Sequence, residues 1–336
     1  MTKLAIVILN WNGQKFLEQF LPTLVGFLPD YAEIVVADNA STDDSVEFLK
    51  NSYPSIRLIE NSKNEGFAKG YNLALRQVEA QYYCLLNSDI EVTEHWIEPV
   101  VEMMDGNEKI AAVQPKLLSY HQRGVFEYAG AAGGFVDKYG YPFCRGRVFS
   151  NLEKDNGQYD TEMDIFWATG AALFVRSDVY RTMGGLDDDF FAHMEEIDFC
   201  WRLKNAGYKI KFCPQSVVYH IGGGTLPKNN SYKTYLNFRN NLFLLLKNLP
   251  DERLAKTFVI RFFMDIMAAG SFLLQGHVKD FFAVFRAVRD FYKNYNYCKG
   301  KRSTMPKLAF EETFPKSIVF LHYFKRKKFF DGKNFS

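Results

Sequence analysis

The chain has 336 residues, 47% of them hydrophobic and 24% charged, which is the balance of a folded protein with ample material for a core. Its formal net charge is only +2, so the overall charge does not indicate a nucleic-acid partner. The five cysteines form no CxxC pair and are odd in number, which argues against a disulfide framework or a zinc knuckle and favours a reducing compartment.

The first ninety residues alternate between apolar runs and amphipathic segments. Strands are predicted over 4–9, 32–38, 55–61 and 82–89, and helices over 16–24, 41–53 and 66–78. Ser41 or Thr42 is the expected N-cap of the second helix. This alternation predicts an α/β fold with a doubly wound, mostly parallel sheet of Rossmann-like type.

The rest of the chain departs from this alternation. Residues 110–165 combine short strand-like pieces with glycine-rich turns, which predicts a small antiparallel ribbon, and a buried strand pair is expected over 164–176. A helix, an acidic loop, a second helix and a strand follow. We therefore expect a catalytic domain over 1–250 and a helical, aromatic and basic extension over 251–336. No stretch resembles a signal peptide or reaches the roughly 20 apolar residues of a membrane span.

Polar side chains cluster where the predicted strands end. The carboxyl ends of parallel strands share one edge of a sheet, where ligands bind in open α/β folds, so these side chains can converge on one site. Neither a GxGxxG fingerprint nor a P-loop is present. An acid in these positions can bind a ribose or hold a divalent cation through oxygen, and for any single acid the alternative is capping of its own loop. The residues are Asn10, Asn12, Asp38, Asn39, Asn61, Asn64, Asn87 and Asp89.

Two further features contain residues suited to catalysis or metal binding. Glu195, Glu196 and Asp198 place three carboxylates within four positions, and a positioned carboxylate is a suitable general base for a hydroxyl. The alternative is a solvated acidic first turn favoured by the helix dipole. His220 ends an apolar strand before the glycine run 222–224, and it is either a metal ligand or a structural histidine. The glycine run predicts a loop that can close over phosphates.

Together these stretches resemble the family 2 glycosyltransferases of GT-A fold, close to their rhamnosyltransferase-like branch. The matches are ordered along the chain and cover most of residues 4–250. They are VILNWNG (7–13), VVADNASTDDS (35–45), NEGFAKGYN (64–72), LLNSDIEV (85–92), the long stretch 168–208, VVYHIGGGT (217–225) and YLNFRNNLFLLLKNLP (235–250).

The resemblance implies roles for these residues. Asp89 corresponds to the last acid of the family's DxD motif, with Asn87 in place of the first, and would hold Mg²⁺ or Mn²⁺ together with His220. The acidic run is similar to the family's EDxD, which makes Glu196 the expected base, with Glu195 as the other candidate and Asp198 beside them. The implied nucleotide-sugar site comprises Asn10, Asn12, Asp38, Asn39, Asn64, Gly66, Lys69 and Asn87.

The implied activity is inverting, metal-dependent transfer of a sugar from a dTDP- or UDP-sugar, dTDP-rhamnose among them, to a hydroxyl of a glycan acceptor in cell-surface polysaccharide synthesis. One alternative is a catalytically inactive nucleotide-sugar-binding subunit of a glycan assembly complex. A sugar-1-phosphate nucleotidyltransferase is a second alternative, but such enzymes normally begin with a glycine-rich basic loop, and LNWNGQKF does not match one.

The C-terminal extension has an aromatic and basic pattern. Phe281, Phe285, Val288 and Tyr292 recur at helical spacing, and Lys279, Arg286, Arg289 and Lys293 are expected on the opposite face. Aromatics also accompany the basic run Lys325–Lys328. Such helices can lie on an anionic membrane, so we expect a cytoplasmic protein held peripherally on the inner face of the cell membrane, with a lipid-linked acceptor. The alternative is packing on the catalytic domain or in an oligomer.

Overall fold

The computed structural model describes residues 2–222, 230–302 and 306–334. A nine-stranded sheet forms its centre, in the order β11-β13-β6-β12-β4-β1-β2-β3, with β5 paired to β13. These strands are β1 (Thr2–Asn10), β2 (Ala32–Asp38), β3 (Arg57–Glu60), β4 (Ala80–Asn87), β5 (Ile90–Val92), β6 (Ile110–Ser119), β11 (Met163–Asp164), β12 (Ala172–Arg176) and β13 (Lys209–His220).

The parallel half of the sheet is the one that the sequence predicts. β1 pairs in parallel with β2 and β4, and β2 pairs in parallel with β3. The register places Asn10 opposite Asp38 and Leu9 opposite Asn87, so the predicted polar strand ends lie along one edge. β12 runs antiparallel between β4 and β6, and β6 is parallel to β13. The α/β fold class with a mainly parallel, doubly wound sheet is confirmed.

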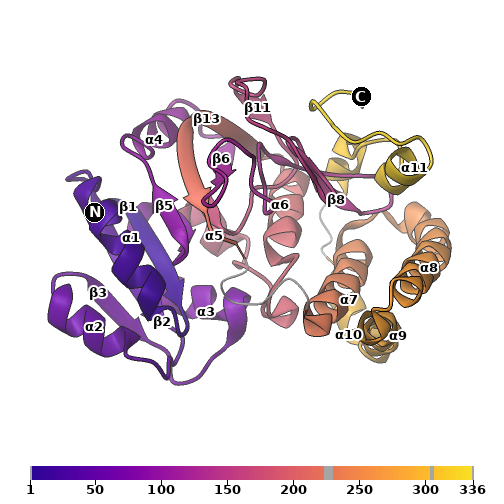
Figure 1. Ribbon diagram of the computed structural model, residues 1–336, viewed down its shortest axis with the longest axis horizontal. Coiled ribbons are helices and arrows are strands. Elements are labelled where there is room, and N and C mark those ends of the chain that lie inside the picture. The colour runs from indigo at the N-terminus through magenta and orange to yellow at the C-terminus, as the bar shows by residue number, and fades with distance from the viewer. Residues whose placement is uncertain (1, 223–229, 303–305, 335–336) are drawn as a thin grey trace.

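Helices cover both faces of this sheet (Figure 1). Successive residues of β1 alternate between two buried clusters, Val7 in one and Ile6 and Ile8 in the other, as expected for a central strand that is covered on both sides. The helices up to residue 248 are α1 (Gln14–Gly26), α2 (Ser45–Ser52), α3 (Gly66–Leu75), α4 (Glu98–Asp105), α5 (Ser177–Thr182), α6 (Glu195–Asn205) and α7 (Ser231–Asn248), with a 3-10 turn η1 (Asp188–Phe190).

The predicted cap of the second helix is wrong. Helix α2 begins only at Ser45, and Asp44 precedes it. The hydroxyl of Ser41 donates instead to Asp38 Oδ1 at 2.6 Å, and the backbone N–H of Thr42 donates to Asn12 Oδ1 at 2.7 Å. Residues 41 and 42 thus belong to the loop that organises the strand-end edge.

A second, four-stranded sheet confirms the predicted antiparallel ribbon. Its order is β10-β9-β8-β7, made of β7 (Gly134–Val136), β8 (Pro142–Cys144), β9 (Arg147–Val148) and β10 (Asn151–Leu152). Trp167, which is almost fully buried, joins the ribbon to the main core, because its indole Nε1–H donates to the carbonyl of Phe135 at 2.9 Å. A Cβ at Gly134 would lie only 2.1 Å from the Trp167 ring, so glycine is required for this close approach.

The C-terminal extension is helical, as predicted, and lies at the end of the molecule farthest from the N-terminal strands (Figure 1). Helix α9 buries Ala283, Val284, Ala287 and Phe291. Its elements are α8 (Asp251–Leu274), α9 (Val278–Lys293), α10 (Tyr295–Gly300), the 3-10 turn η2 (Leu308–Glu312) and α11 (Ile318–Tyr323).

Two expectations for this extension need correction. Helix α8 is long and apolar enough to cross a membrane by length and composition, which the sequence reading missed because Arg261 and Asp265 interrupt its apolar residues. On α9, Phe285 is exposed, as are Arg286 and Arg289, so aromatic and basic residues share the solvent side. The opposite side is the one that is buried.

The contact of Gly134 with Trp167 gives a test of how the two sheets are joined. We expect Gly134→Ala to lower the free energy of unfolding by about 1–3 kcal/mol, because the added methyl forces the buried indole to move. Gly124→Ala is the matched control, since no atom lies within 4 Å of a Cβ there. Thermal unfolding of both variants checks this; equal melting temperatures for the two would contradict it.

Candidate functional site

The ends of β1 and β2 are joined by a buried hydrogen-bond network around Asp38. Asp38 Oδ1 accepts from Asn10 Nδ2 at 3.0 Å and from the Ser41 hydroxyl, and its Oδ2 accepts from the Ser41 N–H at 2.8 Å. Asn12 has a φ of +52°, and its Oδ1 accepts hydrogen bonds from the backbone N–H groups of Thr42 and Asp43 in the same loop. Asp38 is 2% exposed, so here it organises its own loop, and its role in reading a nucleotide stays a prediction.

Asn39 extends this network to the loop that precedes α3. Its Nδ2 donates to Asn64 Oδ1 at 3.0 Å and to the carbonyl of Gly66 at 3.1 Å. Its Oδ1 accepts from Asn61 Nδ2 and from the N–H of Glu65, each at 3.2 Å. The strand-end asparagines are therefore brought together as the sequence predicts.

Gly66 and Lys69 lie at the start of α3. Gly66 has a φ of +77°, and a Cβ there would lie 2.5 Å from the ring of Phe191. Lys69 pairs with Glu65 at 2.8 Å on the surface of the helix. Glycine thus allows the N-terminus of α3 to meet the acidic loop that precedes α6.

Asp89 and His220 meet as predicted, although they lie 131 positions apart. His220 Nε2 lies 3.1 Å from Asp89 Oδ1, and both side chains are buried. The other ring nitrogen, Nδ1, lies 3.3 Å from Glu127 Oε2. Burial alone would lower the pKa of His220, but the carboxylates of Asp89 and Glu127 raise it to about 10. The imidazole is thus held between two carboxylates.

The sequence reading missed Glu127, which lies in the long excursion between β6 and β7. No spacing or motif marks it, and only the parallel pairing of β6 with β13 brings it to His220. The backbone nearby is adapted to it, because Gly222 has a φ of +73° and a Cβ there would lie 2.8 Å from Glu127 Oε1. The other two glycines of the run, Gly223 and Gly224, and the residues up to 229 lie outside the described residues, and so does most of the predicted phosphate loop.

The chemistry of this cluster fits a divalent cation. Two adjacent ligands of a six-coordinate ion with bonds of about 2.1 Å lie about 3 Å apart, which matches the separation of His220 Nε2 and Asp89 Oδ1. Glu127 then occupies the place of a carboxylate that orients a ligating histidine through its other nitrogen. Among the described residues, no group of three or more His, Cys, Asp or Glu side chains is arranged to hold an ion by itself.

Glu195 and Glu196 begin α6 and differ in their environments. Glu195 is buried, whereas Glu196 is partly exposed. In the described part of the chain, Oε2 of each is buried and has no hydrogen-bond partner. Burial raises the pKa of Glu196 to about 7. Burial, and then the neighbouring Glu196, raise the pKa of Glu195 well above its usual range. Glu196 is therefore the member of the pair that can accept a proton at neutral pH.

The start of β12 brings the acid pair close to the end of β4. The N–H of Asn87 donates to the carbonyl of Ala171 at 2.9 Å. The neighbouring Gly170 carries no side chain, and a Cβ there would lie 3.7 Å from Glu196 Cβ and 3.2 Å from the ring of Phe67. Asn87, the turn to Asp89 and Glu196 thus border one region, to which α3 also contributes.

Asp198 has a different position from the other two acids. It is 0% exposed, and its Oδ2 accepts from Arg202 Nε at 2.9 Å and from Lys247 Nζ at 2.8 Å. Its Oδ1 accepts from Asn248 Nδ2 at 2.8 Å. Burial pulls its pKa upward, but Lys247 and Arg202 hold the pKa below its usual value. Asp198 ties α6 to α7, and this geometry does not favour the catalytic role expected for it.

The loop that leads into Glu195 has a strained backbone, and α7 holds it in place. Phe191, His193 and Met194 have φ values of +62°, +68° and +75°. Asn240 on α7 is fully buried, and its Nδ2 donates to the carbonyls of Phe190, Ala192 and His193 at 2.7–2.9 Å. Sequence reasoning missed Asn240 because its three partners are backbone atoms about 50 positions away. It fixes the path of the chain just before the acid pair.

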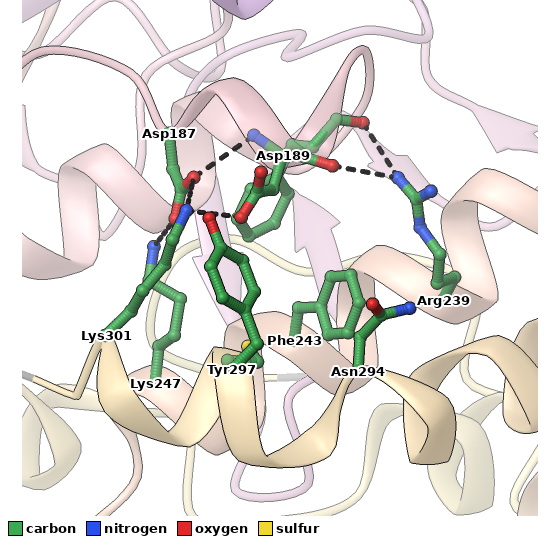
Figure 2. Close-up of a pocket in the computed structure, with 10 residues that line it drawn as sticks. Asp187, Asp189, Arg239, Phe243, Lys247, Asn294, Tyr297 and Lys301 are labelled. Carbon is green, nitrogen blue, oxygen red and sulfur yellow. Dashed lines mark hydrogen bonds and ion pairs between the residues drawn. The ribbon is translucent and has the colours of Figure 1, made fainter.

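A cavity of about 190 Å³ lies beside this loop, between η1, α7 and α10. Figure 2 shows Lys247 and Lys301 directed at Asp187, and Arg239 directed at the backbone of Asp189. Burial would raise the pKa of Asp187, but the two lysines hold it well below its usual range. None of the predicted site residues lines this cavity. Its ion pairs attach Asp187 in the acidic loop to Lys247 of α7 and to Lys301, which follows α10.

Residues 5–155 match the family model for Glycosyl transferase family 2. This part of the chain is thus similar to the family 2 glycosyltransferases, as its sequence motifs indicate. Low-salt glycan biosynthesis hexosyltransferase Agl10 of Haloferax volcanii is 24% identical over 70% of this chain and 73% of its own length. N-acetylglucosaminyl-diphospho-decaprenol L-rhamnosyltransferase of Mycobacterium tuberculosis is 23% identical over 65% of this chain and 75% of its own length.

Solved structures place the fold in the GT-A group. GalNAc-T7, whose crystal structure contains UDP, GalNAc and Mn²⁺, superposes with a TM-score of 0.60 at 17% identity. The match covers 75% of this chain and only 49% of the GalNAc-T7 chain, so this chain spans about half the length of that protein. The predicted GT-A fold is confirmed.

The burial of Asp198 separates a structural from a catalytic role. We expect Asp198→Asn to lower the free energy of unfolding by about 3 kcal/mol, because Lys247 and Arg202 lose their buried countercharge. Asp178→Asn, at an exposed acid in the first turn of α5, is the control and should change stability little. Denaturant unfolding measures both. If Asp198→Asn keeps wild-type stability, Asp198 does not hold α6 and α7 together.

Proposed function

We propose that the protein is an inverting, metal-dependent glycosyltransferase that moves a sugar from a nucleoside-diphosphate sugar to a hydroxyl of a glycan acceptor. The observation that carries this proposal is the convergence, near the end of β4, of the Asp89–His220 pair and the partly exposed Glu196. Carboxylate and imidazole ligands suit a divalent ion at a diphosphate, and an acid with a pKa near 7 suits a general base.

The donor class that we propose is a dTDP- or UDP-sugar, with dTDP-rhamnose as one candidate, and the acceptor that we propose is lipid-linked. The described activity of one relative and the bound ligand of one structural neighbour support this choice. The mycobacterial relative is an L-rhamnosyltransferase named for a diphospho-decaprenol acceptor, and GalNAc-T7 was crystallised with UDP. The network of Asn10, Asp38 and Asn39 supplies the hydrogen-bonding edge on which the nucleotide would rest.

The mechanism assigns one task to each group. Glu196 removes the proton of the acceptor hydroxyl while that oxygen attacks the anomeric carbon, and the bond from this carbon to the diphosphate oxygen breaks on the opposite side. The anomeric configuration is therefore inverted. Asp89 and His220 would hold Mg²⁺ or Mn²⁺, which offsets the negative charge of the leaving diphosphate when bound. Glu127 holds the imidazole of His220 in position.

A panel of nucleotide sugars tests the proposal. The protein is incubated with each donor and Mn²⁺, with and without a lipid-linked acceptor, and the released nucleoside diphosphate is measured. Release with a subset of donors supports a transferase and names its donor. Donor binding by calorimetry without release, for every donor and with acceptor present, would instead support an inactive nucleotide-sugar-binding subunit.

Exchange of each glutamate for glutamine tests the assignment of the base. We expect Glu196→Gln to retain donor affinity and to lose turnover by about 10²-fold or more, the usual scale for a positioned general base. Glu195→Gln is the matched variant at the neighbouring buried acid. If Glu195→Gln is inactive while Glu196→Gln turns over normally, the base is Glu195.

The pH dependence of the reaction gives a second test of Glu196. The base acts as a carboxylate, and burial places its pKa at about 7, so kcat/KM should rise with pH through about 7 and then level off. Activity should therefore be lost as the pH falls below this value. The residual activity of Glu196→Gln should lack this limb. A wild-type profile that is flat from weakly acidic to weakly basic pH would contradict the assignment.

Removal of Asp89 tests the metal site. We expect Asp89→Ala to lose nearly all turnover and the Mn²⁺-dependent part of donor binding, because His220 alone leaves an incomplete ligand set. Glu91→Ala is the control, since this nearby acid pairs with Arg123 at the surface. Calorimetric donor titrations with Mn²⁺ and with chelator measure the effect. Full turnover of Asp89→Ala at saturating donor would exclude a metal role for this acid.

A further inference from the structure

Helix α8 has the reverse of the usual polarity of a surface helix. Its buried stripe is Thr257, Arg261, Asp265 and Ala269. Between residues 257 and 274 both charged side chains are buried, and the exposed side chains are apolar apart from Ser271. We call the exposed apolar set the outer face of α8; it comprises Val259, Phe262, Phe263, Ile266, Met267, Leu273 and Leu274.

The inner side of α8 is fully engaged by the rest of the protein. Arg261 Nη2 lies 3.2 Å from Asp265 Oδ1, and the same oxygen accepts from the Tyr141 hydroxyl at 3.1 Å. The Arg261 guanidinium stacks over the Tyr141 ring, 4.1 Å from its centroid, and contacts Asn241 Oδ1. These contacts fix the rotation of the helix and keep its apolar side outward.

This packing argues against a membrane-spanning position of α8. The helix is long enough to span a membrane, but a crossing would place Arg261 and Asp265 near the middle of the bilayer. One side of α8 is also packed on the protein and would have to remain so during a crossing. A helix with one side on the protein and one apolar side free can instead lie in the plane of the interface.

Exposed aromatic side chains also occur on the helices near α8. Phe282 and Phe285 on α9 are exposed by 63% and 47%, and Tyr323 and Phe324 at the end of α11 by 63% and 67%. In Figure 1, α8 (orange) lies between α9 and α11 at the same end of the molecule, away from the N-terminal strands. One end of the protein thus gathers exposed aromatic side chains from three helices.

The positive charge of the chain is also concentrated in the C-terminal extension. Residues 251–336 contain 17 Lys and Arg against 8 Asp and Glu, whereas residues 1–250 contain 24 against 31. Within the described residues, none of Lys325, Arg326, Lys327 and Lys328 pairs with a carboxylate. A second copy of the chain docked through this end would bring like charges together. The complementary partner is an apolar surface that carries negative charge.

We propose that the outer face of α8, with the exposed aromatics of α9 and α11 at the same end of the molecule, binds an anionic lipid bilayer, with α8 lying in the plane of the interface. This goes beyond the proposed reaction, because it assigns a binding surface remote from Asp89 and Glu196. Apolar insertion supplies the main attraction, and the basic residues add a component that salt screens.

The test uses the full chain and vesicles of phosphatidylcholine, with and without phosphatidylglycerol, in a flotation assay at low and high salt. The wild type should bind anionic vesicles more tightly than neutral ones, and salt should weaken but not abolish the binding. Phe263→Ser with Met267→Ser should weaken binding at least about tenfold, because two inserting side chains are lost. Val25→Ser with Phe27→Ser, at exposed apolar positions at the C-terminal end of α1 and just after it, should bind as the wild type.

Further arms distinguish the remaining outcomes. The triple variant Lys325→Glu, Arg326→Glu and Lys328→Glu should lose the preference for anionic lipid. Alkaline carbonate should release the bound protein, whereas it does not release a spanning helix. The proposal is overturned if the wild type binds neither vesicle, or if the α8 double variant, folded by circular dichroism, binds as well as the wild type. It is also overturned if the wild type is a dimer that this variant dissociates while neither binds lipid. Release of nucleoside diphosphate from soluble donor, measured in parallel, reports separately on the reaction.

Discussion

A buried ion pair between Asp198 and Lys247 joins the two parts of this protein on which its chemistry depends. Asp198 lies one turn after the start of α6, where Glu195 and Glu196 emerge, and Lys247 lies near the end of α7, which leads into the C-terminal helices. In a buried environment such a pair is stabilising only when its remaining hydrogen bonds are satisfied, and here Arg202 and Asn248 satisfy them. The position of the acid pair is therefore coupled to the packing of α7.

The same helix controls the backbone in front of the acids. Three residues with positive φ precede Glu195, and such conformations persist only where the surroundings enforce them. The carboxamide of Asn240 supplies that enforcement by donating to three carbonyls of the loop. Among the described residues, one buried carboxylate oxygen on each glutamate has no hydrogen-bond partner, and burial keeps the pKa of both acids high.

The sequence predicts the elements of the sheet and the location of its polar edge because both follow from local patterns. The apolar runs at 4–9 and 32–38 and the polar residues that follow them require no knowledge of distant contacts. The proximity of Asp89 and His220 was implied by the resemblance of their surrounding motifs to those of the family 2 glycosyltransferases. Glu127 and Asn240 could not be, since each acts on a partner that only the tertiary fold brings near.

The errors in the prediction have the same origin. Ser41 is of the residue type that caps helices, but its hydroxyl donates to the buried carboxylate of Asp38, three positions earlier. The N–H of Thr42 donates to Asn12, 30 positions earlier, so both residues belong to the strand-end loop and not to the helix. The period predicted for α9 was correct, but its aromatic and basic residues do not lie on opposite faces. The small residues Ala283 and Ala287 pack against α7, and Phe285 and Arg286 are both left on the solvent side. Periodicity identifies faces of a helix; it does not say which of them is covered.

Helix α8 shows most clearly why orientation has to come from the structure. From the sequence alone its apolar residues would be assigned to the core and its arginine and aspartate to the solvent. The observed orientation is the opposite, and the contacts of Arg261 and Asp265 with Tyr141 and Asn241 explain why: turning the helix to bury its phenylalanines would break a satisfied polar cluster. That cluster couples the ribbon strand β8, next to Tyr141, to α7 and α8. The outward position of the apolar side chains is therefore built into the fold and does not depend on the presence of a partner.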